Sequence, residues 1–206
     1  ALKAFGSAAR AAENNEDFSE ASRLLGRVAR IWRDEVGDAS QALMSCRRAL
    51  ALWDEAERPD AQERAELLDY AAELCIERER WDEAIGYLVD VLPLLERELE
   101  TTADAESRDS ISTQLARDNA RIARVYQKRS RPDAAASHWR RVLELQPANI
   151  EAAEHLERHY RMAGRPERLI ELYQDLLRAE HETSRIVELN LRLAEIFESM
   201  DLVEDA

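Results

Sequence analysis

Three side chains that can bind a metal recur at intervals of four residues in the last third of the chain. Glu151, His155 and His159 would share one face of a helix, because residues four apart lie above one another. Two imidazoles and a carboxylate are ligands that zinc accepts. The alternative is a row of polar surface residues beside a core tyrosine, Tyr160. Glu157 is not in the register of the zinc metalloprotease motif, so we favour the polar row and predict no metal site.

Other kinds of catalytic site find no support in the sequence. It contains no phosphate-cradling glycine loop, no glycine-flanked serine nucleophile and no cysteine with a histidine placed as its base. Cys46 and Cys75 occupy apolar positions of predicted helices, where a reduced thiol behaves as a small hydrophobic group. A redox pair is the alternative, but neither cysteine has basic or exposed surroundings. We predict no enzymatic activity, no catalytic residue and no cofactor.

A cluster of cations is the remaining candidate for ligand binding. The chain has a formal net charge of −14, yet residues 116–141 contain eight basic and two acidic side chains. Four of the basic side chains recur every three or four residues and so share one helical face, and two more lie on the next helix of the same kind. This candidate site consists of Arg117, Arg121, Arg124, Lys128, Arg158 and Arg161.

Two interpretations of this basic face are open. It can attract an acidic segment of a partner, or its charges can pair with those of neighbouring helices. An acidic stripe lies earlier in the chain, at Glu66, Asp69, Glu73 and Glu77. Exposed ion pairs stabilise a fold only slightly, so pairing alone gives little reason for the cluster.

The elements that carry these residues are predicted by a repeated pattern. Six apolar or turn positions recur 34 residues later, and each copy indicates two short helices joined by a polar turn. The positions are Ile122, Tyr126, Ala135, Trp139, Val142 and Pro147, and then Leu156, Tyr160, Leu169, Tyr173, Leu176 and His181. Such a period is typical of a helical solenoid, whose units bury one another's apolar faces. A non-repetitive helical bundle is the alternative.

The repeated unit resembles the tetratricopeptide repeat. In that family the first helix has an apolar, a small and an aromatic residue, and the second helix opens with a small residue. Here these first-helix positions are Ile122, Ala123 and Tyr126, and Ala135 opens the second helix. The next copy departs from the pattern at Glu157, which replaces the small residue, and at His181, which replaces the closing proline.

The same spacings extend the resemblance over the whole chain. Second-helix triplets occur at Ala1, Phe5, Ala8; Ala42, Cys46, Ala49; Ala84, Leu88, Val91; Ala135, Trp139, Val142; and Leu169, Tyr173, Leu176. First-helix triplets occur at Val28, Ala29, Trp32; Ala71, Ala72, Cys75; Ile122, Ala123, Tyr126; Leu156, Glu157, Tyr160; and Leu193, Ala194, Phe197. The resemblance implies an all-α, right-handed solenoid of about 11 helices in antiparallel pairs, with the first helices lining a concave groove.

We expect one continuous helical-repeat domain from residue 1 to 206, as part of a longer array. Its predicted units are 1–14, a second helix; 19–56, 60–100, 104–149 and 150–183, which are repeats; and 184–206, a truncated repeat. In the fourth unit the surplus length predicts a first helix of about 25 residues, related to long-helix members of the family. Pro93 should lie inside a helix and kink it.

Local signals place several boundaries. Ser19, Asp38 and Ser184 are candidate N-caps, the second with Gln41 as its capping-box partner, and Gly37 supplies a turn. Pro59 and Asp60 should end one helix and start the next.

The net charge and the lengths of the apolar runs argue against two classes of function. The acidic net charge argues against sequence-independent nucleic-acid binding, and no apolar run is long enough to span a membrane. Some members of the family bind a partner's C-terminal carboxylate with lysine and asparagine side chains on adjacent first helices. Asn119 and Asn190 do not lie on the matching face, so this activity is not predicted here.

We predict a cytoplasmic scaffold whose concave groove binds another protein or peptide with an acidic segment. The alternative is the recruiting arm of an enzyme or signalling protein with its catalytic domain outside this chain. Self-association through the chain ends is also considered.

Overall fold

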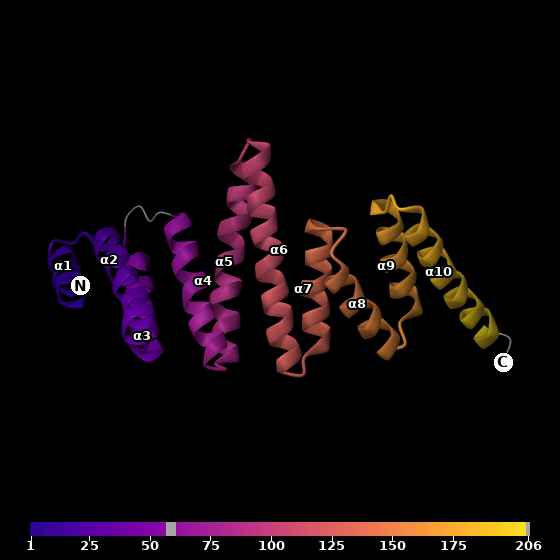
Figure 1. The fold of residues 1–206 in the computed structure, drawn as a ribbon, viewed down its shortest axis with the longest axis horizontal. Coiled ribbons are helices and arrows are strands. Elements are labelled where there is room, and N and C mark those ends of the chain that lie inside the picture. The colour runs from indigo at the N-terminus through magenta and orange to yellow at the C-terminus, as the bar shows by residue number, and fades with distance from the viewer. Residues whose placement is uncertain (57–60, 205–206) are drawn as a thin grey trace. The chain divides into compact units, whose positions relative to one another are not determined.

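A computed structural model describes residues 1–56 and 61–204, and Figure 1 shows the arrangement of its helices. In these residues the chain forms ten α-helices, one π-helical turn and no strand. The elements are α1 (Leu2–Asn14), α2 (Phe18–Ile31), η1 (Trp32–Val36), α3 (Ala39–Glu55), α4 (Ala61–Glu77), α5 (Trp81–Thr101), α6 (Ala105–Lys128), α7 (Pro132–Leu145), α8 (Ile150–Met162), α9 (Pro166–Ala179) and α10 (Thr183–Glu204). The predicted all-α fold is confirmed.

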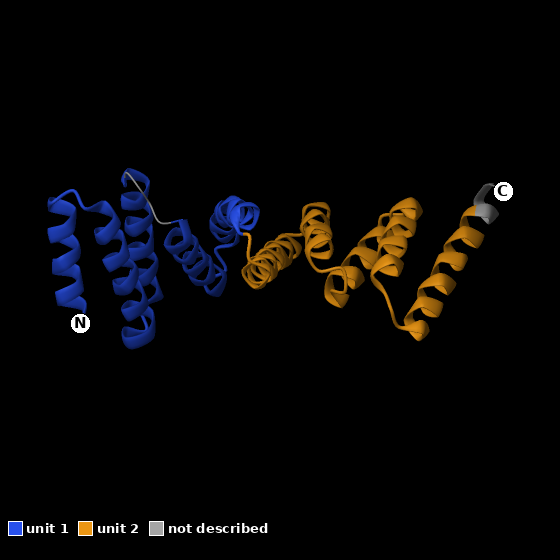
Figure 2. Ribbon diagram, turned by 90° about the horizontal axis from the view of Figure 1, so that it is seen from above, with its two compact units in different colours: residues 1–102 blue, residues 103–206 orange. Residues whose placement is uncertain are grey.

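The chain divides into two compact units, drawn in blue and orange in Figure 2. Unit 1 comprises residues 1–102 and unit 2 comprises residues 103–206. Within unit 1, α2 packs against α3 and α4 against α5; within unit 2, α6 packs against α7 and α8 against α9. These pairs are antiparallel hairpins. One continuous domain, and its division into repeats, stay predictions.

Three of the hairpins close with the same turn. In the hairpin of α6 and α7, the backbone N–H of Arg131 donates to the carbonyl oxygen of Tyr126 at 2.9 Å. The equivalent bonds join Arg80 to Cys75 at 2.8 Å and Arg165 to Tyr160 at 3.0 Å. The residue before each donor has a left-handed backbone: Glu79 (φ 55°), Ser130 (φ 54°) and Gly164 (φ 60°). This is the Schellman arrangement, which satisfies carbonyl groups at the end of a helix.

The hairpin of α2 and α3 has one more residue in its turn, as the triplet spacing indicates. The extra residue is accommodated in the π-helical turn η1, a form of helix that commonly absorbs a single insertion. Gly37 follows with φ 78°, and the N–H of Asp38 donates to the carbonyl of Trp32 at 2.8 Å. A glycine suits this position because it adopts a left-handed conformation without a Cβ clash.

The predicted caps have different outcomes. The carboxylate of Asp38 accepts the backbone N–H groups of Ser40 and Gln41, each at 3.0 Å, so this N-cap is confirmed. The prediction for Ser19 is wrong, because Asp17 caps α2 by accepting the N–H of Glu20 at 3.1 Å.

Two further predicted boundaries differ from the structure or lie outside it. Ser184 is not a cap, because α10 already begins at Thr183. The predicted boundary at Pro59 and Asp60 lies outside the described residues, as does Ala206.

Two unusual helices are present. α6 has 24 residues, where the sequence predicts about 25. α5 continues through Pro93 to Thr101, so the proline does not end the helix. A proline inside a helix removes one backbone hydrogen bond, and packing elsewhere along the helix must compensate. Among the described residues, no helix is both long and apolar enough to cross a membrane.

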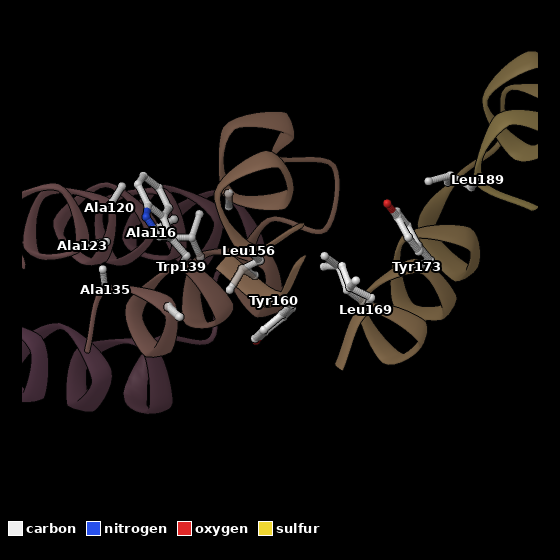
Figure 3. Close-up of a cluster of buried hydrophobic side chains, with 14 of the residues drawn as sticks. Ala116, Ala120, Ala123, Ala135, Trp139, Leu156, Tyr160, Leu169, Tyr173 and Leu189 are labelled. Carbon is white, nitrogen blue, oxygen red and sulfur yellow. The ribbon is translucent and has the colours of Figure 1, made fainter. Parts of the chain in front are cut away.

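The repeat positions form the buried core of each unit. In unit 2 the core is made by α6 to α10, and Figure 3 shows its central side chains. Trp139 and Tyr173, both 1% exposed, are its largest fully buried members.

In unit 1 the core includes Cys46 and Cys75, which are free and fully buried. Burial raises the pKa of the Cys46 thiol to about 12, and that of Cys75 is also raised by burial. Both are therefore thiols rather than reactive thiolates at neutral pH.

Two of the repeat triplets contain exposed apolar residues. On α10, Leu193 is buried, but Ala194 is exposed and Phe197 is 48% exposed. At the start of the chain, Ala1 and Ala8 are exposed. These four residues match the repeat triplets but are exposed in the structure. On α10 the buried positions are instead Leu189, Leu193 and Ile196.

Candidate partner-binding face

The six cations predicted from the sequence all lie on first helices of unit 2. α6 positions four of them near its C-terminal end, and α8 positions Arg158 and Arg161. We define the first-helix face as the surface formed by these residues and by the α10 residues that border α8. The chain folds this way because the apolar positions of α6 and α8 pack on the second helices, which leaves the charged positions outside.

Arg121 is largely a structural residue. Its side chain is 14% exposed, and its guanidinium lies 3.1 Å from the carboxylate of Asp118, which is completely buried. Arg117 approaches the same carboxylate at 3.7 Å. A buried carboxylate is costly unless it has a charged or hydrogen-bonding partner, so Arg121 belongs to the interior as much as to the surface. Reversing its charge would therefore disturb the fold.

Arg124 joins α6 to α8. Its guanidinium makes a two-pronged ion pair with Glu151, at 2.9 and 2.6 Å, and lies over the ring of Trp139 at 5.6 Å. The hydrogen bonds from Arg124 lower the pKa of the Glu151 carboxyl group. Planar two-pronged pairs of this kind fix orientation as well as adding energy. Arg124 therefore sets the register between the two first helices.

The remaining cations differ in their contacts. Arg161 lies 3.1 Å from the carboxylate of Glu157 and donates to the hydroxyl of Tyr173 at 3.3 Å. Lys128 and Arg158 are exposed and have no ion-pair partner among the described residues. The pairing interpretation thus accounts for Arg121, Arg124 and Arg161, but it leaves two charges that face solvent.

The three metal-ligand candidates have separate partners. Glu151 is held by Arg124, and the ring of His155 stacks on Trp139 with ring centres 4.7 Å apart. His155 also meets the side-chain amide of Gln127 at 3.0 Å through Nδ1, and burial lowers its pKa. His159 lies 3.4 Å from the carboxylate of Asp133. These contacts match the polar-row interpretation, in which each side chain connects neighbouring helices.

A groove lies between α8 and α10, with a volume of about 820 Å³. Arg192 of α10 crosses it to Glu157 of α8 at 2.8 Å, and also pairs with Glu188 at 2.6 Å. Its lining is mostly charged: Glu154, Glu157, Arg158, Arg161, Glu188, Leu191, Arg192 and Glu195. The groove therefore presents both signs of charge side by side, with an acidic excess on the α10 wall.

No protein-family model and no curated protein sequence matches the chain. Among solved structures, two crystal structures of MamA, a tetratricopeptide-repeat protein, are similar. The first has a TM-score of 0.53 at 16% identity and covers 86% of this chain and 85% of MamA. The second has a TM-score of 0.50 at 16% identity, with coverages of 89% and 94%.

This chain has a tetratricopeptide-repeat-like fold. The likeness agrees with the hairpins, the shared turn and the buried triplets, and at this identity it shows the fold alone. The all-α solenoid class predicted from the sequence is thereby confirmed.

In unit 1 of the tetratricopeptide-repeat-like fold, opposite charges also link first helices. Arg30 of α2 lies 3.6 Å from Glu66 of α4, and Arg33 pairs with Glu73 at 3.4 Å and with Glu77. Most of the acidic stripe noted in the sequence is therefore matched to Arg30 of α2 and Arg33 of η1. Exposed pairs such as these contribute little energy individually.

Sequence reasoning missed several residues of the site. Asp118 is the anchor for Arg121, and its signal is an acidic residue inside an otherwise basic island. Glu157 and Arg192 bridge α8 and α10, although Glu157 was noted only as a departure from the family pattern. Ion pairs between residues 35 positions apart depend on how the hairpins stack, which the repeat pattern does not specify.

Proposed function

We propose that this chain is a protein-interaction scaffold and that the first-helix face of unit 2 binds a segment of a partner protein. The fold supports this function because stacked helical hairpins present a continuous surface to a ligand. The observation that carries the proposal is the charged groove between α8 and α10, whose lining includes Arg158, an exposed cation without an ion-pair partner among the described residues. No catalytic step is assigned to the chain.

The partner segment is expected to carry both signs of charge, with acidic side chains meeting Lys128 and Arg158. These two cations can form new ion pairs without breaking existing ones, since neither has an ion-pair partner among the described residues. By contrast, Arg121 and Arg124 are already engaged, so their contribution to binding is to position neighbouring groups. Arg161 lines the groove but is already paired with Glu157.

The experiment begins with capture of partners from the source cell and purification of one candidate. Its affinity is then measured for the Lys128→Glu/Arg158→Glu double variant. We expect binding to weaken about tenfold, mainly through slower association, and the loss to shrink in high salt. Helicity and melting temperature should stay unchanged, because both side chains are exposed.

A matched control is available on α9. Arg168→Glu/Arg178→Glu also reverses two exposed arginines, at 53% and 74% side-chain exposure, but on a second helix. The control should keep full affinity. Equal affinities for the wild type and the Lys128/Arg158 variant would refute the proposed face, and so would an equal loss in the control.

A further inference from the structure

On two second helices, one repeat position holds an arginine that crosses to the next second helix. The position lies five residues after the residue that opens the second-helix triplet, and on α3 and α7 it is Arg47 and Arg140. Arg47 pairs with Glu83 of α5, and Arg140 lies 3.8 Å from Glu171 of α9. On α1 the same position is Gly6. A Cβ at Gly6 would meet no atom within 4 Å, so this part of α1 faces open space.

The carboxylates that these arginines meet have no counterpart on α3. Glu171 lies two residues after the residue that opens the triplet of α9, and the equivalent residue of α3 is Met44. Glu83 lies one residue before the opening of the α5 triplet, and the equivalent residue of α3 is Gln41. Met44 is 60% exposed. The arginine and its carboxylate are thus replaced together between α1 and α3, by residues without charge.

The replacement leaves a groove between α1 and α3, with a volume of about 590 Å³. Its floor contains Leu25, Val28 and Trp32, and we call it the second-helix groove. At the repeat position of Trp32, unit 2 has Tyr160, whose ring centre lies 5.8 Å from the guanidinium of Arg140 and whose hydroxyl accepts from it at 2.7 Å. With glycine in place of that arginine, the half-buried ring of Trp32 borders the groove.

A groove at the equivalent place inside the chain shows that the repeat itself produces this feature. Between α7 and α9, which have helices before and after them, it has a volume of about 490 Å³. Its lining includes Arg140, Arg141, Arg165 and Arg168. The second-helix groove therefore forms without regard to where the chain begins, and it differs from its counterpart in having apolar side chains at its floor.

The charges around the second-helix groove are mostly positive. Lys3, Arg10 and Arg48 line it, and its acidic residue, Glu13, pairs with Arg48. Lys3 and Arg10 are exposed and have no ion-pair partner in the part of the chain that the structure describes. They lie on the groove side of α1, three and four residues from Gly6. In a chain of net charge −14, this excess of cations favours a ligand with acidic groups.

The dimensions of the second-helix groove suit a helix. Its lining runs along α1 from Leu2 to Glu13 and along α3 from Gln41 to Arg48, which at about 1.5 Å per residue spans about 16 Å and about 10 Å. Both helices pack on α2, so the floor lies between two helical walls. An amphipathic helix in such a groove buries its apolar face and keeps its flanks in water.

We propose that the second-helix groove binds an amphipathic helix of a partner protein, with apolar side chains on Trp32 and acidic side chains beside Lys3 and Arg10. Such a helix occupies the place that Arg140 occupies in unit 2, and it removes apolar surface from water. Its acidic flanks supply the negative charge that the rim of the groove lacks. This surface is built from second helices, so the inference does not depend on the first-helix face proposed above.

The test uses a fluorescein-labelled peptide of about four helical turns, with leucine on one face and glutamate along both of its flanks. Fluorescence anisotropy measures its binding to the wild type and to Gly6→Arg. We expect Gly6→Arg to weaken the affinity at least about tenfold, because the new side chain takes the place of a leucine on Trp32. The added positive charge would by itself favour an acidic peptide, so a loss reports the filled groove. The melting temperature should not fall, since glycine is a poor helix former and its Cβ position is open.

Two controls separate the filling of the groove from the change in charge. Gly86→Arg on α5 adds the same side chain at another helical glycine whose Cβ position is open, outside the second-helix groove, and should keep full affinity. A peptide with lysine in place of each glutamate should bind at least about tenfold more weakly. Lys3→Glu/Arg10→Glu should reduce the preference for the glutamate peptide, most clearly at low salt.

Several results would overturn the proposal. One is the absence of saturable binding of the glutamate peptide up to about 1 mM, and another is equal affinity for the two peptides. An unchanged affinity in Gly6→Arg would put the peptide elsewhere on the chain, and an equal loss in Gly86→Arg would show that the effect is not specific to the groove. Light scattering of the protein alone covers the remaining case: growth in mass with concentration that Gly6→Arg abolishes would identify a second copy as the occupant.

Discussion

The hairpins α6–α7 and α8–α9 are successive repeats, but they have different residue types at equivalent positions of their first helices. At one repeat position α6 has Ala123, which is completely buried, whereas α8 has Glu157, whose side chain is 21% exposed. Glu157 forms ion pairs with Arg161 and Arg192. The reverse occurs one turn earlier, where α6 buries Asp118 and α8 buries Ala152.

This difference shows that a repeat position specifies a direction, inward or outward, more strongly than it specifies a residue type. Both inward charges have an opposite charge beside them, supplied by the same helix for Asp118 and by the next first helix for Glu157. Asp118 has Arg121 at 3.1 Å, and Glu157 has Arg192 at 2.8 Å. The two hairpins should therefore respond very differently to the same exchange of residues.

Exchanging the residues at the shared position is the strongest way to test this comparison. Ala123→Glu places a carboxylate at a completely buried site, and we expect a loss of about 4–5 kcal/mol in the free energy of unfolding. Glu157→Ala removes partly exposed ion pairs and should cost about 1 kcal/mol or less. Urea denaturation followed by circular dichroism measures both. Similar losses in the two variants would show that the hairpins are equivalent.

Arg121 allows a second test, on a single helix. Arg121→Glu sets a second carboxylate beside the buried Asp118, and we expect a loss of about 3 kcal/mol, the low end for breaking a buried ion pair. Lys128→Glu, two turns further along α6 at an exposed position without an ion-pair partner among the described residues, should change the free energy of unfolding by at most about 0.5 kcal/mol. Equal urea midpoints for the two variants would contradict a structural role for Arg121.

Much of the fold could be predicted because the information is local. The 34-residue offset between Tyr126 and Tyr160 identifies the hairpins, and the spacing of Ala42, Cys46 and Ala49 identifies buried positions in unit 1. Helical periodicity is a property of consecutive residues, so one sequence is enough to detect it. The location of Gly37 in a turn follows in the same way.

The features that were missed depend on a choice between similar local signals or on contacts that only the folded structure shows. A serine and an aspartate are both good N-caps, and local spacing did not distinguish Ser19 from Asp17. The basic face was identified from charge alone, but the partners of Arg121 and Arg124 lie on a buried position and on the next hairpin. Ala194 and Phe197 match the core pattern, yet their burial requires a covering helix. Whether the first-helix face binds a partner stays a prediction.

The smallest expected effect concerns the turns that close the two hairpins. Ser130 follows α6 with φ 54°, and Gly164 follows α8 at the same repeat position with φ 60°. A residue with a Cβ is strained in the left-handed region by about 1 kcal/mol, whereas glycine is not. We therefore expect Ser130→Gly to raise the free energy of unfolding by about 0.5–1 kcal/mol and Gly164→Ser to lower it by a similar amount. A Cβ at Gly164 would meet no atom within 4 Å, so the loss would report backbone conformation and not a clash. Thermal unfolding of both variants, followed by circular dichroism, provides the measurement. If Ser130→Gly lowered the melting temperature instead, the greater chain entropy of glycine in the unfolded state would outweigh the relief of strain, and the two turns would not be equivalent.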